Sequence, residues 1–174
     1  FHLRQGIRFH NKPPANGREM VASDVKYCFD RRCGTGSGFT QPSPFSYAGM
    51  EALKEITTPD NYTVVVKLKQ FDFGLLPTIL TDYWGEIYPP EVIALPGGLD
   101  NWRNVCGTGA YILTDYVPAS SLTFKRNPDY WGYDEFHPGN RLPHPGGRPK
   151  GALRNRSDIQ RPKSQERPDH LGGY

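Results

Sequence analysis

Alternating apolar and polar positions predict β-strands in three parts of the chain. Residues 1–9 carry apolar side chains at positions 1, 3, 7 and 9 around Gly6, which predicts a strand, a turn and a second strand. Valines at 64–66 follow a polar turn and predict a buried strand over Tyr62–Leu68. Two further strand-like runs, Ala110–Val117 and Ser121–Arg126, are separated by three residues and predict a β-hairpin.

Spacings of three and four residues predict helices between these strands. Ser23 stands where a helix cap belongs, and the pattern predicts a helix over 23–33 that ends in a glycine-rich stretch. A short amphipathic helix is predicted over Tyr47–Ile56, because positions 50, 53 and 56 are apolar and share one face. The apolar segment Phe73–Leu80 and the proline-led segment 89–93 are also predicted to be helical.

Proline, glycine and asparagine mark the turns and the end of the regular pattern. A turn-rich loop is predicted over Asn11–Gly17, and Asn127-Pro128-Asp129 forces a turn before a cluster of aromatic residues. Beyond Arg141 the apolar residues are too sparse to bury a face. We therefore expect a folded part over residues 1–143 and a disordered, Pro/Gly/Arg-rich tail over residues 144–174.

Composition supports a polar, loop-rich protein of the mixed α/β class. The 174 residues include 17 Pro and 19 Gly, and the mean hydropathy is −0.65. The chain has no apolar run of about 18 residues, the length that crosses a membrane. It also opens without an export signal, so we expect any signal or lipid anchor to lie upstream.

The net charge of +3 belongs to the tail. Residues 141–174 hold 8 Lys and Arg against 3 Asp and Glu, whereas residues 1–140 hold 13 against 15. The basic character therefore says little about what the folded part binds. It leaves open an alternative function in which the tail contacts nucleic-acid phosphates, although aromatic residues for base stacking are almost absent there.

Titratable and nucleophilic residues show no spacing that is typical of an enzyme or a metal site. Cys28, Cys33 and Cys106 are too few for a disulfide framework, and we favour three buried thiols over one bridge and one free thiol. The five histidines lack partners at metal-ligand spacing. Helix-start and surface roles account for the acidic residues Glu19, Asp24 and Asp30 without catalysis. We therefore expect no enzyme activity, no cofactor and no metal.

Six blocks, in the same order, resemble the extracytoplasmic solute-binding proteins of family 5, which bind oligopeptides and dipeptides for ABC transporters. The blocks comprise Phe1, Leu3, Arg4, Gly6, Phe9 and His10; Ala22, Asp24, Val25, Tyr27, Phe29, Asp30 and Arg31; the strand Thr63–Leu68; Pro90, Glu91 and Val92; Gly107, Thr108, Gly109 and Tyr111; and Asn127–Gly132. Each block alone is a weak pattern, but their order across residues 1–143 is specific. Ser23, Cys28 and Ala110 depart from the family pattern at positions that affect capping and turns.

The resemblance implies part of the first lobe of a type II periplasmic-binding-protein clamshell, whose two lobes close on an extended peptide. The amino-acid sequence after Pro143 does not resemble the family. A truncated or frame-shifted coding sequence would produce such a change. The expected partners are a peptide or other small solute and the permease subunits of an ABC transporter, outside the cytoplasmic membrane.

Three aromatic residues are the candidates for contact with the solute: Tyr47, Tyr83 and Trp84. The alternative is that each packs against its own lobe. Gly107 and Gly109 are expected to permit a tight turn, because no lysine follows them to complete a phosphate loop. Tyr130 and Trp131 are expected to pack at the turn beside the hairpin.

Overall fold

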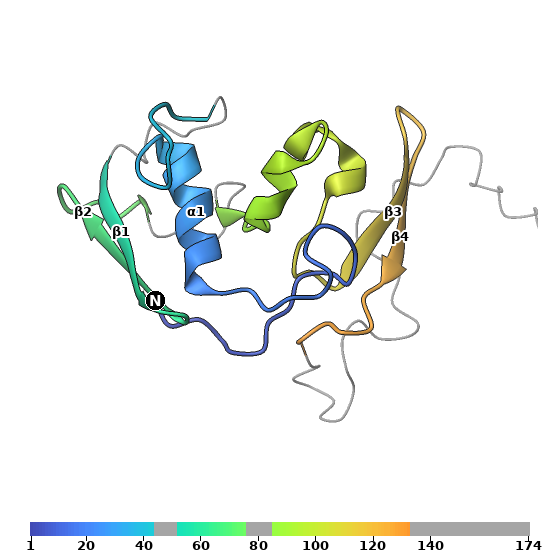
Figure 1. Cartoon of the computed structure of the whole chain (residues 1–174), viewed down its shortest axis with the longest axis horizontal. Coiled ribbons are helices and arrows are strands. Elements are labelled where there is room, and N and C mark those ends of the chain that lie inside the picture. Colours follow the sequence, from blue (N-terminus) through green and yellow to red (C-terminus); the bar gives the residue numbers. More distant parts are fainter. Residues whose placement is uncertain (44–51, 76–84, 133–174) are drawn as a thin grey trace, which may run out of the picture.

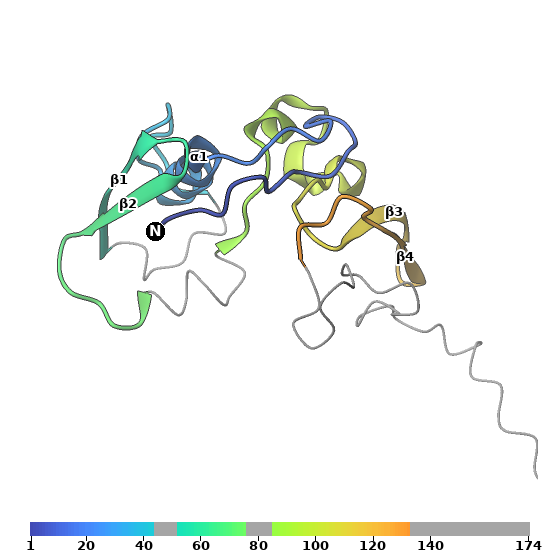
Figure 2. The ribbon, with the colours of Figure 1, turned by 90° about the horizontal axis from the view of Figure 1, so that it is seen from below.

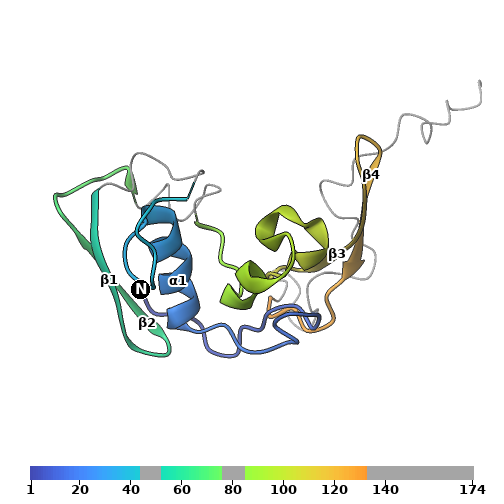
Figure 3. The ribbon, with the colours of Figure 1, turned by 45° about the horizontal axis from the view of Figure 1, so that its top comes forward.

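Two small antiparallel sheets lie on either side of a helical centre in the computed structural model of this chain, which describes residues 1–43, 52–75 and 85–132 (Figure 1). One sheet pairs β1 (Leu53–Asp60) with β2 (Thr63–Leu68), and the other pairs β3 (Tyr111–Val117) with β4 (Ser121–Arg126). Helix α1 (Ala22–Cys33) packs against the first sheet. Three short 3₁₀ helices, Pro90–Ala94, Gly98–Asp100 and Trp102–Asn104, lie between α1 and the second sheet (Figures 1 and 3).

Strand β1 contradicts the predicted helix over Tyr47–Ile56, at least in the part that the structure describes. Leu53 and Ile56 are both buried although they lie three residues apart in a strand. A register shift between Leu53 and Glu55 against β2 inserts one extra residue, so both side chains reach the same face. The bulge therefore produces the spacing that is typical of a helix. Residues 47–51 of the prediction lie outside the described residues.

Strand β2 forms where it was predicted, but it is buried on one face only. Val64 is buried, whereas Val65 is exposed. Among the described residues, α1 and the N-terminal segment cover one face of the strand, and alternate side chains meet solvent. The predicted hairpin is confirmed as β3 and β4, with Ala119 at φ 57° in the connecting loop.

Helix α1 is confirmed with a different start from the predicted one. Val21, not Ser23, is the N-cap residue, and its backbone N–H donates to Asp24 Oδ2 at 2.9 Å. Asp24 therefore caps the helix from its third position, and its negative charge also suits the helix N-terminus. Gly34 ends the helix in the left-handed conformation, at φ 66°.

The N-terminal segment is extended but forms isolated bridges instead of two strands. His2 pairs with Thr63, and Arg8 pairs with Glu19. The predicted turn at Gly6 is present, at φ 76°, and the loop over 11–17 is made of turns. Figure 2 shows this segment running from the first sheet, past the foot of α1, to the 3₁₀ helices. It therefore connects the two halves of the described structure.

Buried apolar residues form two clusters, one in each half. The first joins α1 to β1 and β2 and consists of Ala22, Val25, Phe29, Leu53, Ile56, Val64 and Leu75. The second lies between the N-terminal segment and the 3₁₀ helices and consists of Phe9, Ala15, Val92 and Cys106. Within the described ranges, no helix has the length and apolar content to cross a bilayer. Residues 76–80 of the predicted helix Phe73–Leu80 and the whole of the tail lie outside these ranges.

Candidate functional site

The three aromatic residues predicted to contact a solute, Tyr47, Tyr83 and Trp84, lie outside the described residues. Two described residues close to them in the chain line a common cavity. Ser43 precedes the segment with Tyr47, Glu86 lies two positions after Trp84, and both line one cavity of about 720 Å³. This volume lies within the range of about 300–1,000 Å³ that is typical of small-molecule sites.

The walls of this cavity, which we call the large cavity, come from α1 and from the 3₁₀ helices. Arg31 and Arg32 from the last turn of α1 line one wall. The lining from the chain after Trp84 is mixed in polarity and consists of Glu86, Ile87, Tyr88, Val92, Leu99, Asp100, Val105, Cys106 and Gly107. Charged residues of both signs and apolar residues therefore line the same space.

Tyr88 fixes the position of α1 relative to this lining. Its backbone N–H and carbonyl oxygen both contact Cys28 Sγ, at 3.5 and 3.4 Å, and Arg32 Nη2 donates to the neighbouring Glu86 carbonyl oxygen at 2.7 Å. Burial raises the pKa of the Cys28 thiol to about 11 and also raises the pKa of Tyr88. Both groups are therefore neutral at physiological pH, and Cys28 acts as a packing and hydrogen-bonding residue.

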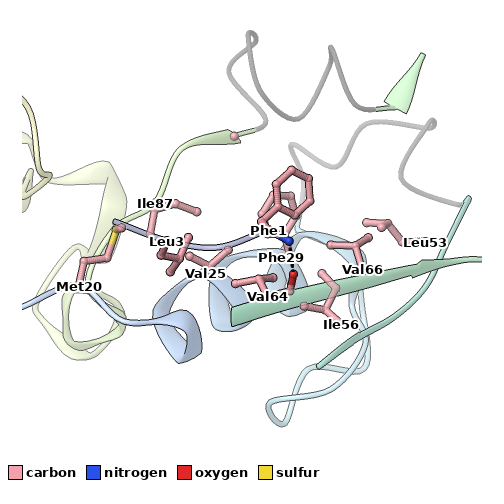
Figure 4. A pocket seen from close by; sticks show the side chains of 11 residues that line it. Phe1, Leu3, Met20, Val25, Phe29, Leu53, Ile56, Val64, Val66 and Ile87 are labelled. Atoms are coloured by element: carbon pink, nitrogen blue, oxygen red, sulfur yellow. Dashed lines mark hydrogen bonds between the residues drawn. The ribbon is translucent and has the colours of Figure 1, made fainter. Parts of the chain in front are cut away.

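A second pocket, of about 170 Å³, is apolar and belongs to the core beside α1 (Figure 4). Side chains of α1 and β2 point toward one another across it, including those of Val25, Phe29, Val64 and Val66. Its polar contact is the hydrogen bond from the Phe1 amino group to the Val64 carbonyl oxygen, at 2.7 Å. Without converging polar groups, this pocket has little means to orient a polar solute.

Arg18 links α1 to the 3₁₀ helix Pro90–Ala94 through ion pairs with one acidic residue of each. Its guanidinium contacts both carboxylate oxygens of Asp24, at 2.8 and 2.9 Å, and both carboxylate oxygens of Glu91, at 2.7 and 2.8 Å. These hydrogen bonds lower the pKa of Glu91 and raise the pKa of Arg18. The sequence analysis did not identify Arg18, and no local pattern indicates it, because Glu91 lies 73 residues away.

His10 connects the N-terminal segment to the residues just before β3. Its Nε2 lies 3.0 Å from the Gly109 carbonyl oxygen, and its Nδ1 lies 3.4 Å from the Gly107 backbone nitrogen. Asn127 Nδ2 donates to the same Gly109 carbonyl oxygen at 3.0 Å. The two glycines therefore serve as backbone hydrogen-bonding groups. The chain bends over residues 108–110, and neither glycine has a positive φ, so this bend does not use the left-handed conformation at either one.

The remaining candidate residues have structural roles. Asp30 is buried and bonds to Lys26 Nζ and Ser37 Oγ, so the surface role expected for it is wrong. Tyr130 and Trp131 have ring centroids 5.2 Å apart, and Arg4 lies over the Trp131 ring. Among the described residues, no group of three histidine, cysteine or acidic side chains is arranged to hold a metal ion.

The three cysteines do not form a disulfide. Cys28 and Cys106 are buried as expected, but Cys33, at the end of α1, is only partly buried. Burial raises the pKa of each thiol.

Comparison with known sequences identifies one family. The model of the family described as "Bacterial extracellular solute-binding proteins, family 5 Middle" matches residues 1–150. The "Dipeptide-binding protein" of Escherichia coli (strain K12) is 31% identical over 144 residues, which cover 76% of this chain and 26% of that protein. "Di/tripeptide-binding protein 1" of Pseudomonas aeruginosa (strain UCBPP-PA14) is 28% identical over 148 residues, which cover 78% and 27%. The chain thus spans about a quarter of the length of these curated relatives.

Solved structures agree with the mixed α/β fold. A periplasmic binding protein from Helicobacter pylori, solved with the peptide STSA, matches with a TM-score of 0.62 and 25% identity, over 76% of this chain and 28% of that chain. A dipeptide binding protein from Pseudoalteromonas sp. SM9913, solved with Met-Leu, matches with a TM-score of 0.62 and 24% identity, over 77% and 28%. The described elements therefore have the arrangement of one part of a periplasmic binding protein.

Proposed function

We propose a receptor function for this chain, which belongs to the bacterial extracellular solute-binding proteins of family 5. In this function it forms part of the first lobe of the substrate-binding component of an ABC transporter. The receptor captures peptides or similar small solutes outside the cytoplasmic membrane and delivers them to the permease subunits for import. The proposed location of the full-length parent is periplasmic or extracellular, in association with the membrane.

The family match over residues 1–150 carries this proposal. Peptides are favoured as solutes because the two curated relatives described above are named for dipeptides or tripeptides. Other relatives bear different names: "Heme-binding protein A" of Haemophilus influenzae is 28% identical over 144 residues. Since the chain covers only about a quarter of such proteins, the identity of the solute depends largely on residues outside it.

The relatives are binding proteins, which supports the absence of catalysis in this chain. Within the described ranges, the buried carboxylates of Asp24 and Asp30 form ion pairs, and Asp24 also caps α1. None of the relatives named above supports nucleic-acid binding through the basic tail.

Within this function, Tyr47, Tyr83 and Trp84 are proposed to contact the solute. Support comes from Ser43 and Glu86, which flank their segments and line the large cavity. Aromatic rings provide apolar contact area for varied side chains while their polar atoms bind water or main-chain groups. In a receptor for varied peptides, main-chain hydrogen bonds supply affinity and roomy pockets tolerate different side chains.

The test is a calorimetric titration of the intact receptor that contains this chain with a mixed tri- to pentapeptide library. We expect saturable binding at about micromolar concentration, or about 8 kcal/mol. Solute-dependent tryptophan fluorescence adds a site-specific measurement, because the chain has three tryptophans, Trp84, Trp102 and Trp131. Trp84→Phe is expected to reduce the fluorescence change, and Trp131→Phe to preserve it. An intact receptor that binds no peptide contradicts the proposed solute class.

A further inference from the structure

Arg31 lines the large cavity, and most of its hydrogen-bond donors have no partner among the described residues. Its Nη1 lies 3.4 Å from Tyr88 Oη, which is long for a hydrogen bond to a guanidinium. No carboxylate of the described residues forms an ion pair with it. A guanidinium carries five N–H donors, so at least four of those on Arg31 have no acceptor among the described residues.

Three other cations in the described part of the chain form ion pairs. Arg18 contacts two carboxylates, Lys26 pairs with Asp30, and Lys67 pairs with Glu55. The negative end of the α1 dipole accounts for a basic residue in the last turn. It does not account for a guanidinium on the wall of a cavity of about 720 Å³ that makes one long contact with a tyrosine.

Two hydroxyl groups line the same cavity as Arg31. Tyr88 is buried, and its Oη accepts from Arg31, so its own O–H hydrogen remains to be donated. Ser43 also lines the cavity, and its backbone N–H donates to the Arg31 carbonyl oxygen at 3.2 Å, which ties this residue to the end of α1. A guanidinium and hydroxyl donors beside one cavity form a site for an anionic oxygen group.

We propose that Arg31, assisted by the Tyr88 hydroxyl, binds a carboxylate of the solute in the large cavity. This inference rests on the proposed function and names the chemical class of the solute. A singly charged group is favoured over a phosphate, because the acidic residues Glu86 and Asp100 line the same cavity and would repel a multiply charged anion. The same two acidic residues favour a solute that also carries an amino group, as a peptide with free ends does.

The experiment compares solutes of different charge on the native chain. The ¹⁵N-labelled chain is titrated with millimolar Ala-Phe as the free dipeptide, as its C-terminal amide and as its N-acetyl derivative. We expect the free dipeptide to shift the resonances of residues that line the large cavity. The amide should bind about tenfold to a hundredfold more weakly, as expected for the loss of a charged hydrogen-bond partner. The N-acetyl derivative, which keeps the carboxylate, should retain the Arg31 contact.

Variants test whether Arg31 is the residue responsible. Arg31→Gln should remove the preference for the free acid over the amide, and Arg31→Lys should retain part of it because the charge remains without the planar fork. Arg126→Gln makes the same charge change on an exposed residue of β4 that does not line the cavity, and should leave the preference intact. The comparison of acid with amide on the native chain needs no variant, so a misfolded Arg31→Gln does not prevent the test.

Each outcome separates this inference from the proposed function. Equal shifts by the acid and the amide, or an unchanged preference in a folded Arg31→Gln, would overturn the role of Arg31 and leave peptide binding intact. Absence of shifts at the cavity with every dipeptide would overturn the carboxylate site. Peptide binding by the intact receptor would then still decide the proposed function independently.

Discussion

His10 Nε2 lies 3.0 Å from the carbonyl oxygen of Gly109, a residue 99 positions further along the chain. For Nε2 to donate this hydrogen bond, it must carry the proton of the neutral ring, which leaves Nδ1 as an acceptor. The Gly107 backbone N–H is placed to donate to Nδ1 at 3.4 Å. Protonation of His10 would place a hydrogen on Nδ1, which then faces the Gly107 N–H, and this hydrogen bond would be lost. The hydrogen bond from Gly107 to His10, which joins the N-terminal segment to the residues just before β3, therefore requires a neutral imidazole.

Stability should accordingly fall in mild acid. Burial and the nearby Lys12 charge lower the pKa of His10 below its usual 6.5, although the Gly109 hydrogen bond opposes them. The unfolded chain then binds the proton more readily than the folded chain, so the stabilisation is present above about pH 6.5 and is lost as the pH falls through the lowered pKa. Urea unfolding at about pH 7.5 and about pH 5.5 measures the difference. His10→Gln should reduce this difference, whereas His2→Gln should not. An equal difference in both variants would contradict the role of His10.

The two carboxylates that contact Arg18 should differ in their contribution to the free energy of unfolding. The Asp24 side chain is 5% exposed and also caps α1, whereas the Glu91 side chain is 45% exposed. Asp24→Ala should cost about 3 kcal/mol, because it leaves a partly buried guanidinium with one partner and removes a cap. Glu91→Gln should cost about 1 kcal/mol or less. Urea unfolding of both variants provides the measurement. Equal losses in the free energy of unfolding would show that the contribution of each carboxylate does not depend on its burial.

Alanine substitutions at Gly36 and Gly38 separate the free-energy cost of a steric clash from the cost of backbone strain. Both have positive φ, at 76° and 85°. A Cβ on Gly36 would lie 2.7 Å from Asp30 Oδ2, the oxygen that bonds to Ser37 Oγ and Lys26 Nζ, whereas a Cβ on Gly38 would meet no atom within 4 Å. Gly38→Ala should cost about 1 kcal/mol from strain alone. Gly36→Ala should cost about 2 kcal/mol more, because it also displaces a buried carboxylate. Thermal unfolding of the two variants checks the order, and a smaller loss for Gly36→Ala would refute the contact.

The thiols should react in an order set by burial. Cys33 is partly buried, whereas Cys28 and Cys106 are buried. Since the thiolate is the reactive form, raised pKa values and low exposure slow modification. Titration of the native chain with an aromatic disulfide reagent should modify one thiol rapidly and the other two only as the chain opens. Cys33→Ser should remove the fast phase. A fast phase that persists in this variant would place the exposed thiol elsewhere.

Elements with local signals could be predicted from the sequence. The hairpin of β3 and β4 alternates along both strands and has a turn between them, and α1 ends at a glycine. Strand β1 could not be recognised, because its bulge puts Leu53 and Ile56 on one face at a helical spacing. The N-cap of α1 was misplaced because Val21, which has no capping side chain, is held instead by the carboxylate of Asp24.

The candidate site depended on contacts over long distances in the sequence. His10, Arg18 and Arg31 are ordinary polar residues in their local context, and their roles arise from partners that are 99, 73 and 57 residues away. A periodicity argument detects which residues share a face of one element, but it does not reveal which elements meet. The three predicted aromatic contacts stay predictions, since they lie outside the described residues.

The chain alone should bind peptide about a thousandfold more weakly than the intact receptor. Because the chain spans about a quarter of the length of its curated relatives, it supplies only part of a two-lobed site. A peptide bound to one lobe leaves part of its main chain in water and gains nothing from closure of the clamshell. If the intact receptor binds at about micromolar concentration, near 8 kcal/mol, and one lobe supplies about half of this free energy, the remaining 4 kcal/mol corresponds to millimolar binding. Parallel titrations of the chain and of the intact receptor with the same tri- to pentapeptide library measure the ratio. Micromolar binding by the chain alone would show that residues 1–174 contain a complete site, and the interpretation as part of one lobe would then be wrong.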